Sequence, residues 1–117
     1  MIISKSQVQG HTLLTIEGVI KLGESARFLA DTLDRVLLEE SGHLLLDLSG
    51  INTIDSTGIG ELVGFLVRFQ ERRRKLILIA PSARITKLLE VAQLSPLFPT
   101  FDTVDEALAQ EPREVAG

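Results

Sequence analysis

Two short apolar runs constrain the fold of this chain more than any other feature of its sequence. Leu44–Leu48 is apolar apart from Asp47, and Leu76–Ala80 is apolar throughout. Runs of this kind are typical of strands that are buried on both faces of a parallel sheet. The segment between them carries apolar residues at three- and four-residue spacing, which is the period of an amphipathic helix. A strand, a helix and a second strand in this order predict a parallel pair joined by a right-handed crossover.

The remaining segments extend this pattern into a single α/β domain. Alternating residues on both sides of Gly10-His11 predict two strands joined by a tight link. We expect a mixed, mostly parallel sheet of four to five strands packed with about four helices, in a domain over residues 1–110 with a flexible tail over 111–117. The expected strands are Ile2–Val8, Thr12–Ile16, Leu44–Leu48, Leu76–Ala80 and Phe98–Phe101, and the expected helices run from Glu24 to about Ser41, from about Gly58 to Arg73, after the Pro81-Ser82 cap, and after a capping box formed by Thr103 and Glu106.

Each predicted helix carries one apolar face, and a serine–glycine pair separates a strand from the segment that follows it. Ser49-Gly50 is expected to end the strand that begins at Leu44. The residues expected to face the core are Ala26, Leu29, Leu33, Val36 and Leu37 in the first helix, Ile59, Leu62, Val63, Leu66 and Phe69 in the second, and Ile85, Leu88, Leu89 and Ala92 in the third.

The composition argues against several classes of function. The chain has 117 residues, a formal net charge of −4 and no cysteine, tryptophan or tyrosine. A negative chain has no general attraction to nucleic acid or anionic lipid, and single-strand binding needs exposed aromatic rings. No residue cluster predicts a metal site or a cofactor. No signal peptide or membrane-spanning run is visible, so we expect a cytoplasmic protein that binds neither nucleic acid nor membrane.

The segment Asp55-Ser56-Thr57-Gly58 lies where a buried strand meets the next helix, the usual place for a binding site in an open α/β sheet. One interpretation is that Asp55 or Ser56 only caps the helix. The other is regulatory, because a phosphate on Ser56 would add roughly −1.5 to −2 charges at a helix end that tolerates anions. Beside Asp55, it would disfavour any partner that buries this face. The loop Lys21–Glu24 also follows a parallel strand and is expected beside this turn.

Catalysis by this turn is not predicted. Ser56 as a nucleophile would need a base, and His11 and His43 stand at strand starts with no sequence reason to meet it. The run Glu71–Lys75 is basic, but cations at a helix C-terminus suit the dipole and are expected to stay solvated. We therefore expect a binding protein and not an enzyme.

A glycine pattern in the same region resembles a nucleotide-binding motif. Gly58, Gly60 and Gly64 have the order of a dinucleotide fingerprint, but the spacing is one residue too long. Gly60 and Gly64 would equally allow the helix to pack closely on the sheet. Nucleotide binding is therefore the weaker interpretation.

A family resemblance adds to these observations. Asp47-Leu48-Ser49-Gly50-Ile51, followed by Ile54-Asp55-Ser56-Thr57-Gly58-Ile59-Gly60, closely resembles the signature of STAS domains of the bacterial anti-sigma factor antagonist type, and the resemblance extends over residues 2–108. It implies that Ser56 is phosphorylated by an anti-sigma factor that is also a serine kinase. The unphosphorylated form would bind that partner and release the sigma factor for transcription, and a PP2C-type phosphatase would restore binding. The implied partner-binding residues are Asp55, Ser56, Thr57, Gly58, Ile59, Gly60, Lys21 and Glu24.

One position departs from the family pattern. Many antagonists have an aspartate where Gly18-Val19-Ile20-Lys21 places Lys21. A base in place of an acid near the partner surface would retune or change the partner. Because the family also includes members of lipid-transport complexes and stressosomes and reported nucleotide binders, an accessory subunit of a transporter or signalling complex, or a weak nucleotide-binding module, is the alternative. No oligomeric state is predicted.

Overall fold

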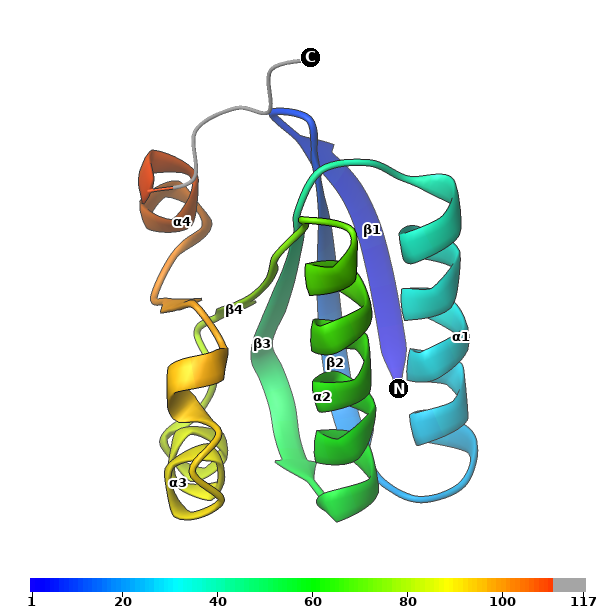
Figure 1. Cartoon of the computed structure of the whole chain (residues 1–117). Helices are drawn as coiled ribbons and strands as arrows, with labels where there is room; N and C mark the ends of the chain where they lie inside the picture. The colour runs from blue at the N-terminus through cyan, green and yellow to red at the C-terminus, as the bar shows by residue number, and fades with distance from the viewer. Residues whose placement is uncertain (111–117) are drawn as a thin grey trace.

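Five strands form one mixed sheet in the order β1-β2-β3-β4-β5 (Figure 1). In the computed structural model, which describes residues 1–110, β1 pairs antiparallel with β2 and the following pairs are parallel. The predicted fold class is confirmed, whereas the tail predicted over 111–117 lies outside the described residues. The elements in chain order are β1 (Ile2–Val8), β2 (His11–Ile20), α1 (Glu24–Glu39), β3 (Leu44–Ile54), α2 (Ser56–Glu71), β4 (Leu76–Ile79), α3 (Ala83–Val91), a 3₁₀ helix (Ser95–Leu97), β5 (Thr100–Phe101) and α4 (Val104–Gln110).

The helices cover the two faces of the sheet unequally. One large apolar cluster joins α1, α2 and α3 to side chains such as Leu46 and Leu78, and α1 and α2 stand side by side over the sheet (Figure 1). A smaller cluster on the other face joins α4 to Leu45 and Ile77 through Ala107. Because successive strand residues point to opposite faces, β3 and β4 are buried on both sides, which explains their apolar runs.

The predicted helical faces are largely confirmed. All five predicted residues of α1 are buried. In α2, Ile59 and Val63 are half-buried and Phe65 is an additional core residue. In α3 the prediction is wrong for Leu88, which is 40% exposed, and for Ala92, which follows the end of the helix. This short helix meets the large cluster through Ile85 and Leu89 only.

The strand β3 does not end at Ser49-Gly50 as predicted. Its pairing with β2 shifts register near Glu17 and then continues to Ile54. A Cβ atom on Gly50 would lie 2.8 Å from Glu17 Cγ and 3.0 Å from the Ile16 carbonyl oxygen, so glycine is needed here for close approach of two strands. Pairing with β4 covers only Leu44–Asp47, and beyond it β3 runs on with β2 as its partner.

The basic run after α2 was predicted to stay in solvent, but two of its arginines hydrogen-bond to other parts of the chain. Arg74 donates from Nε to the Gly42 carbonyl at 2.6 Å and from Nη1 to the Leu37 carbonyl at 2.9 Å, and its guanidinium lies 4.6 Å from the centre of the Phe69 ring. Arg72 also donates to the Leu37 carbonyl, at 3.2 Å. These cations therefore complement the C-terminal carbonyls of α1, whose last turn has no basic residue.

Candidate functional site

The turn between β3 and α2 is built around the carboxylate of Asp55. Asp55 is the N-cap of α2, and its Oδ1 accepts a hydrogen bond from the Gly58 N–H at 2.9 Å. Its Oδ2 accepts from the Leu22 N–H at 2.8 Å, and its own N–H donates to the Ile20 carbonyl at 3.0 Å. Asp55, and not Ser56, is therefore the capping residue, and it also links the turn to the loop after β2.

Ser56 is the first residue of α2 and is exposed to solvent. Its hydroxyl makes no hydrogen bond within the described part of the chain. It stands at the positive end of the helix dipole, where an added anion is tolerated. The serine side chain is thus accessible, and its modification would remove no hydrogen bond within the described residues.

The neighbouring residues of the turn divide into buried and exposed ones. Gly58 is buried, and a Cβ atom there would lie 2.6 Å from Ile54 Cγ1 and 2.7 Å from Ile20 Cγ2. Thr57 and Ile59 are half-buried, whereas Gly60 is exposed. Gly58 therefore lets the start of α2 approach the ends of β2 and β3.

Gly60 and Gly64 do not pack on the sheet, so the packing alternative considered for them is wrong. Both are exposed, and a Cβ atom at either would meet nothing within 4 Å. They share the solvent-facing side of α2, since residues four apart in a helix lie on one face. The fold itself does not require glycine at either position.

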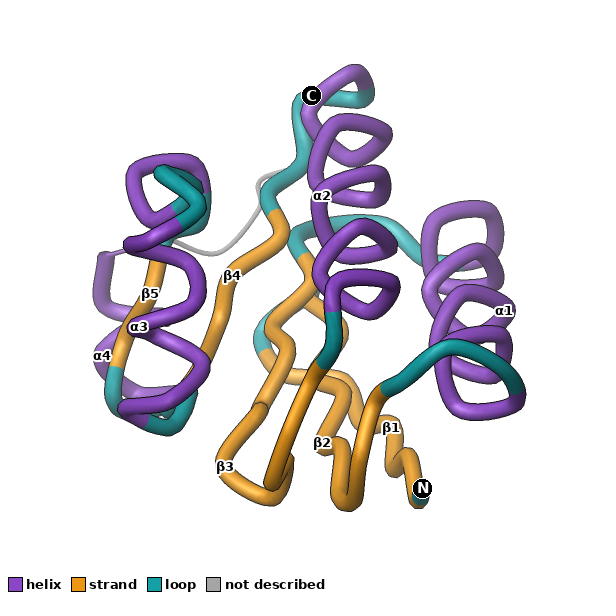
Figure 2. The backbone as a smooth tube through the Cα atoms, turned by 90° about the horizontal axis from the view of Figure 1, so that it is seen from below, coloured by secondary structure: helices purple, strands orange, loops and turns teal. Residues whose placement is uncertain are grey.

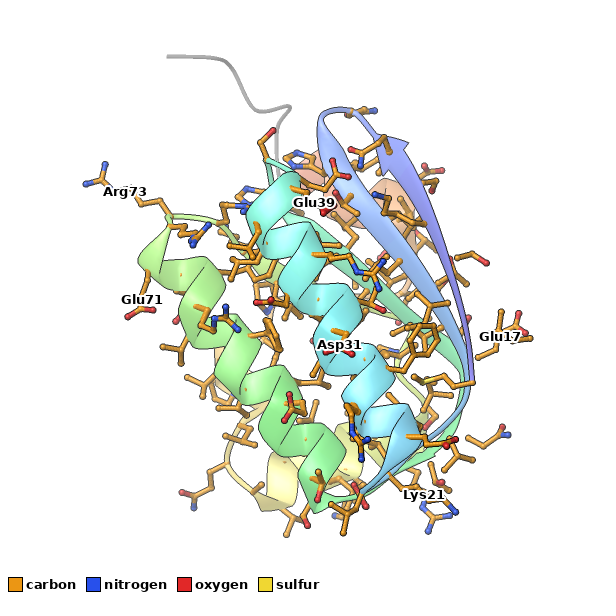
Figure 3. The ribbon with its side chains drawn as sticks, turned by 90° about the vertical axis from the view of Figure 1, so that its right-hand side faces the viewer. Glu17, Lys21, Asp31, Glu39, Glu71 and Arg73 are labelled. Carbon is orange, nitrogen blue, oxygen red and sulfur yellow. The ribbon has the colours of Figure 1, made fainter. Side chains whose placement is uncertain are left out.

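The loop Lys21–Gly23 lies directly beside the Ser56 turn, as the parallel topology predicts. Figure 2 shows the β2–α1 and β3–α2 connections next to each other, and the Leu22–Asp55 hydrogen bond joins them. Figure 3 shows Lys21 at the end of the molecule where α1 and α2 both begin. Lys21 and Glu24 are exposed, and the loop is braced by a 2.9 Å hydrogen bond from the Lys21 N–H to Ser25 Oγ.

A groove of about 710 Å³ opens next to this loop, and its most exposed apolar residues, Leu22 and Phe28, were not selected by sequence reasoning. Leu22 is 75% exposed and Phe28 is 42% exposed. An apolar residue between Lys21 and Gly23 was the available signal for the first, and a ring outside the apolar face of the predicted helix for the second. The groove is lined by Met1, Val19, Lys21, Leu22, Glu24, Ser25 and Phe28.

The hydrogen bonds to Asp55 also determine its charge state. The N–H groups of Gly58 and then of Leu22 favour the carboxylate and lower the pKa of Asp55 from its ordinary value, and desolvation opposes them only in part. Asp55 is therefore a carboxylate at neutral pH. A negative charge already stands beside Ser56 before any modification.

Neither histidine lies at this turn. His11 and His43 stack on each other with ring centroids 4.9 Å apart, at the start of β2 and just before β3. His11 Nδ1 accepts from the His43 N–H, and His43 Nδ1 accepts from the Lys75 N–H, both at 2.9 Å. Both rings therefore serve as acceptors for backbone groups at the opposite end of the parallel strands. Ser56 has no histidine base within the described residues.

Two further features are absent from residues 1–110. No group of three or more histidines and carboxylates there has a metal-binding arrangement. None of the helices in this range is long and apolar enough to cross a membrane.

Comparison with known proteins places the whole arrangement in one family. The STAS domain family matches residues 3–107. A protein of Thermotoga neapolitana that is named as an anti-sigma factor antagonist is 29% identical over 77 residues, which is 66% of this chain and 68% of that protein. The anti-sigma-B factor antagonist of Listeria monocytogenes is 31% identical over 67 residues, which is 57% of this chain but only 59% of the relative.

Solved structures agree on the fold. The crystal structure of a Thermotoga maritima protein that is named as an anti-sigma factor antagonist superimposes with a TM-score of 0.85 over 92% of both chains, at 21% sequence identity. The relatives carry names of a regulatory and non-enzymatic class, in agreement with the expectation from the sequence. The chain therefore belongs to the STAS domain family, with relatives named as anti-sigma factor antagonists.

Proposed function

We propose that this protein is an anti-sigma factor antagonist whose binding is switched by phosphorylation of Ser56. The observation that carries the proposal is the exposure of Ser56 at the first residue of α2, beside the fixed carboxylate of Asp55. The unphosphorylated turn binds an anti-sigma factor and so frees a sigma factor for transcription. Such a role is carried out in the cytoplasm.

The electrostatics of the turn support a switch of this kind. Phosphorylation adds roughly −1.5 to −2 charges and three acceptor oxygens to Ser56. The carboxylate of Asp55 is adjacent in the chain, so a partner that buries the turn would have to desolvate two neighbouring anions. A contact that is favourable with a neutral hydroxyl becomes costly, while the helix end itself tolerates the phosphate.

The partner in this proposal is an anti-sigma factor with serine kinase activity. It transfers the γ-phosphoryl group of ATP to Ser56 Oγ, with release of ADP and the hydroxyl proton, and a PP2C-type phosphatase hydrolyses the phosphoserine. The surface that it contacts surrounds the serine. It comprises Lys21, Glu24, Asp55, Thr57, Ile59 and Gly60, and the buried Gly58 lies beneath them and supports the turn.

The test is direct phosphorylation and binding. Anti-sigma factor kinases encoded in the same genome are purified, and each is incubated with this chain and ATP. Mass spectrometry is expected to map one phosphate to Ser56. Ser56→Ala should bind the kinase like the wild type, and Ser56→Asp should bind at least tenfold more weakly. Ser6→Ala on β1 is the matched control, because it removes another exposed hydroxyl that lies outside this surface and should leave phosphorylation intact.

Two outcomes contradict the proposal. A phosphate that maps to another residue, or no phosphate with any of these kinases, removes Ser56 as the switch. Equal affinity of Ser56→Ala and Ser56→Asp for the partner removes the electrostatic mechanism. Binding to a partner that ignores both substitutions would instead favour an accessory subunit of a larger complex.

A further inference from the structure

We infer that Asp55 is a positioning residue, which fixes the Lys21–Gly23 loop against the Ser56 turn so that Leu22 and Ser56 present one surface to the same partner. The inference rests on the proposed function for the identity of that partner. It reassigns Asp55, which the family resemblance places among the contact residues, to a role inside the protein. It adds Leu22 as the apolar contact of the surface.

The carboxylate of Asp55 is engaged by two hydrogen bonds from its own chain. Each of its carboxylate oxygens already accepts a backbone N–H, Oδ1 from Gly58 and Oδ2 from Leu22, at 2.9 and 2.8 Å. Charge-assisted hydrogen bonds of this length are stronger than neutral ones. The side chain is therefore committed to the two segments of its own chain, and one carboxylate fixes their relative position.

The loop held by this carboxylate is also fixed on its other side and carries an exposed apolar residue. Lys21–Gly23 is tied at its other side by the hydrogen bond from the Lys21 N–H to Ser25 Oγ and by that from the Arg27 N–H to the Gly23 carbonyl. Leu22 in the middle of it is 75% exposed and contributes nothing to the core. An apolar side chain on a backbone that is held in place is partly preorganised for binding, because the loop loses less conformational freedom when a partner covers it.

The surroundings of Leu22 indicate the chemistry of the partner. Leu22 stands on the rim of the groove that also contains Val19 and Phe28, and the exposed Lys21 and Glu24 flank it. An apolar centre with charged residues at its edge is the usual anatomy of a binding interface. Because the Leu22–Asp55 hydrogen bond makes this patch continuous with the Ser56 turn, its occupant is the anti-sigma factor itself, which would contribute an apolar pocket for Leu22.

An isosteric substitution separates the two tasks of Asp55. In Asp55→Asn the amide oxygen can still accept from the Gly58 N–H, and asparagine is a good N-cap. The amide nitrogen, however, is a donor and faces the Leu22 N–H, so the link to the loop is lost. We expect hydrogen exchange at the Leu22 amide to become at least tenfold faster, while the Gly58 amide stays protected. This arm needs no partner.

The functional arm uses the kinase that phosphorylates Ser56. Leu22→Ser is expected to raise the KM for this chain at least tenfold with kcat within twofold of the wild type, because the serine and its turn are unchanged. Val91→Ser is the matched control, since Val91 is an equally exposed apolar residue, 72%, on α3. It should behave as wild type.

The double variant Asp55→Asn/Leu22→Ser decides whether Asp55 acts through Leu22. If it does, the two losses overlap, and Asp55→Asn changes the KM less than twofold once Leu22 is serine. If instead the KM increase of the double variant equals the product of the two single-variant increases, Asp55 contacts the partner directly and the inference is overturned. A wild-type KM for Leu22→Ser would overturn it too. Absence of phosphorylation in the wild type would instead be a failure of the proposed function.

Discussion

Ser56 and Thr57 are adjacent hydroxyl residues with different environments. Ser56 is exposed and makes no hydrogen bond within residues 1–110, whereas Thr57 is half-buried and lines a small hollow with Arg27 and Glu61 of the two neighbouring helices. A kinase that must reach the oxygen atom would meet the side chains of α1 and α2 at Thr57 but open solvent at Ser56. Exposure, and not the choice between serine and threonine, therefore distinguishes the two positions.

A change of pH tests the role of the charge on Asp55. The folded-state pKa of Asp55 is lowered, so its contribution to stability is present in full above the unfolded value of about 3.9 and is lost as the pH falls through the lower folded-state value. In an NMR titration from pH 6 to 2, the Leu22 and Gly58 amide resonances should move together, below pH 3.9. Asp55→Asn should abolish this step. Movement of the Leu22 amide at a higher pH, or independently of Gly58, would contradict the assignment.

Among the elements, α2 is notable for glycines of two kinds. Gly58 lies against β2 and β3 and has no room for a side chain, whereas Gly60 and Gly64 face solvent with free space around them. Helical glycine costs about 1 kcal/mol relative to alanine. The helix therefore carries two residues that lower its stability without serving its packing. Ser56, Gly60 and Gly64 are four residues apart, so the glycines leave the exposed face of α2 next to Ser56 without side chains.

Alanine substitutions should separate these two kinds of glycine. Gly60→Ala and Gly64→Ala are each expected to raise the free energy of unfolding by about 0.8–1 kcal/mol, because helix propensity improves and nothing is displaced. Gly58→Ala should lower it by about 1–3 kcal/mol, since its Cβ atom would overlap Ile54 and Ile20. Urea denaturation of the three variants measures these changes. A loss of stability in Gly60→Ala or Gly64→Ala would show that these positions do serve the fold.

For the whole molecule, phosphorylation should change binding while the fold persists. Ser56 contributes no contact to the core, and the favourable effect of a phosphate at a helix N-terminus is only about 0.3–1 kcal/mol and is opposed by Asp55. Protein with phosphoserine placed at position 56 during translation should melt within about 4 °C of the wild type. Phe69→Ala, which loses a fully buried ring and about 3–5 kcal/mol, is the comparison for a damaged fold. A comparable loss in the phosphorylated protein would mean that the switch acts by unfolding.

Local patterns account for most of what the sequence predicts about this molecule. The change of period from strands to helices, the Ser82 cap and the polar turn before α2 are all set by residues close in sequence, and the structure agrees with them. The remainder depends on distant partners. The continuation of β3 past Gly50 depends on pairing with β2, and Arg74 donates to a carbonyl group of α1. Asp55, which follows β3, accepts from Leu22, which follows the neighbouring strand β2. None of these partners can be identified from spacing in a single sequence.

The length of β3 has a consequence for how Ser56 can be recognised. Beyond Asp47 the strand continues with β2 but without β4 as a partner, and Ser56 begins α2 shortly after the strand ends. Many modifying enzymes thread an extended segment through a cleft, but here the acceptor oxygen is attached to a helix start whose neighbours come from β2 and β3. An enzyme that selects this serine would have to recognise the folded surface around it and not a linear sequence motif. Unfolded protein would lack that surface, so only folded molecules would bind the kinase as substrates.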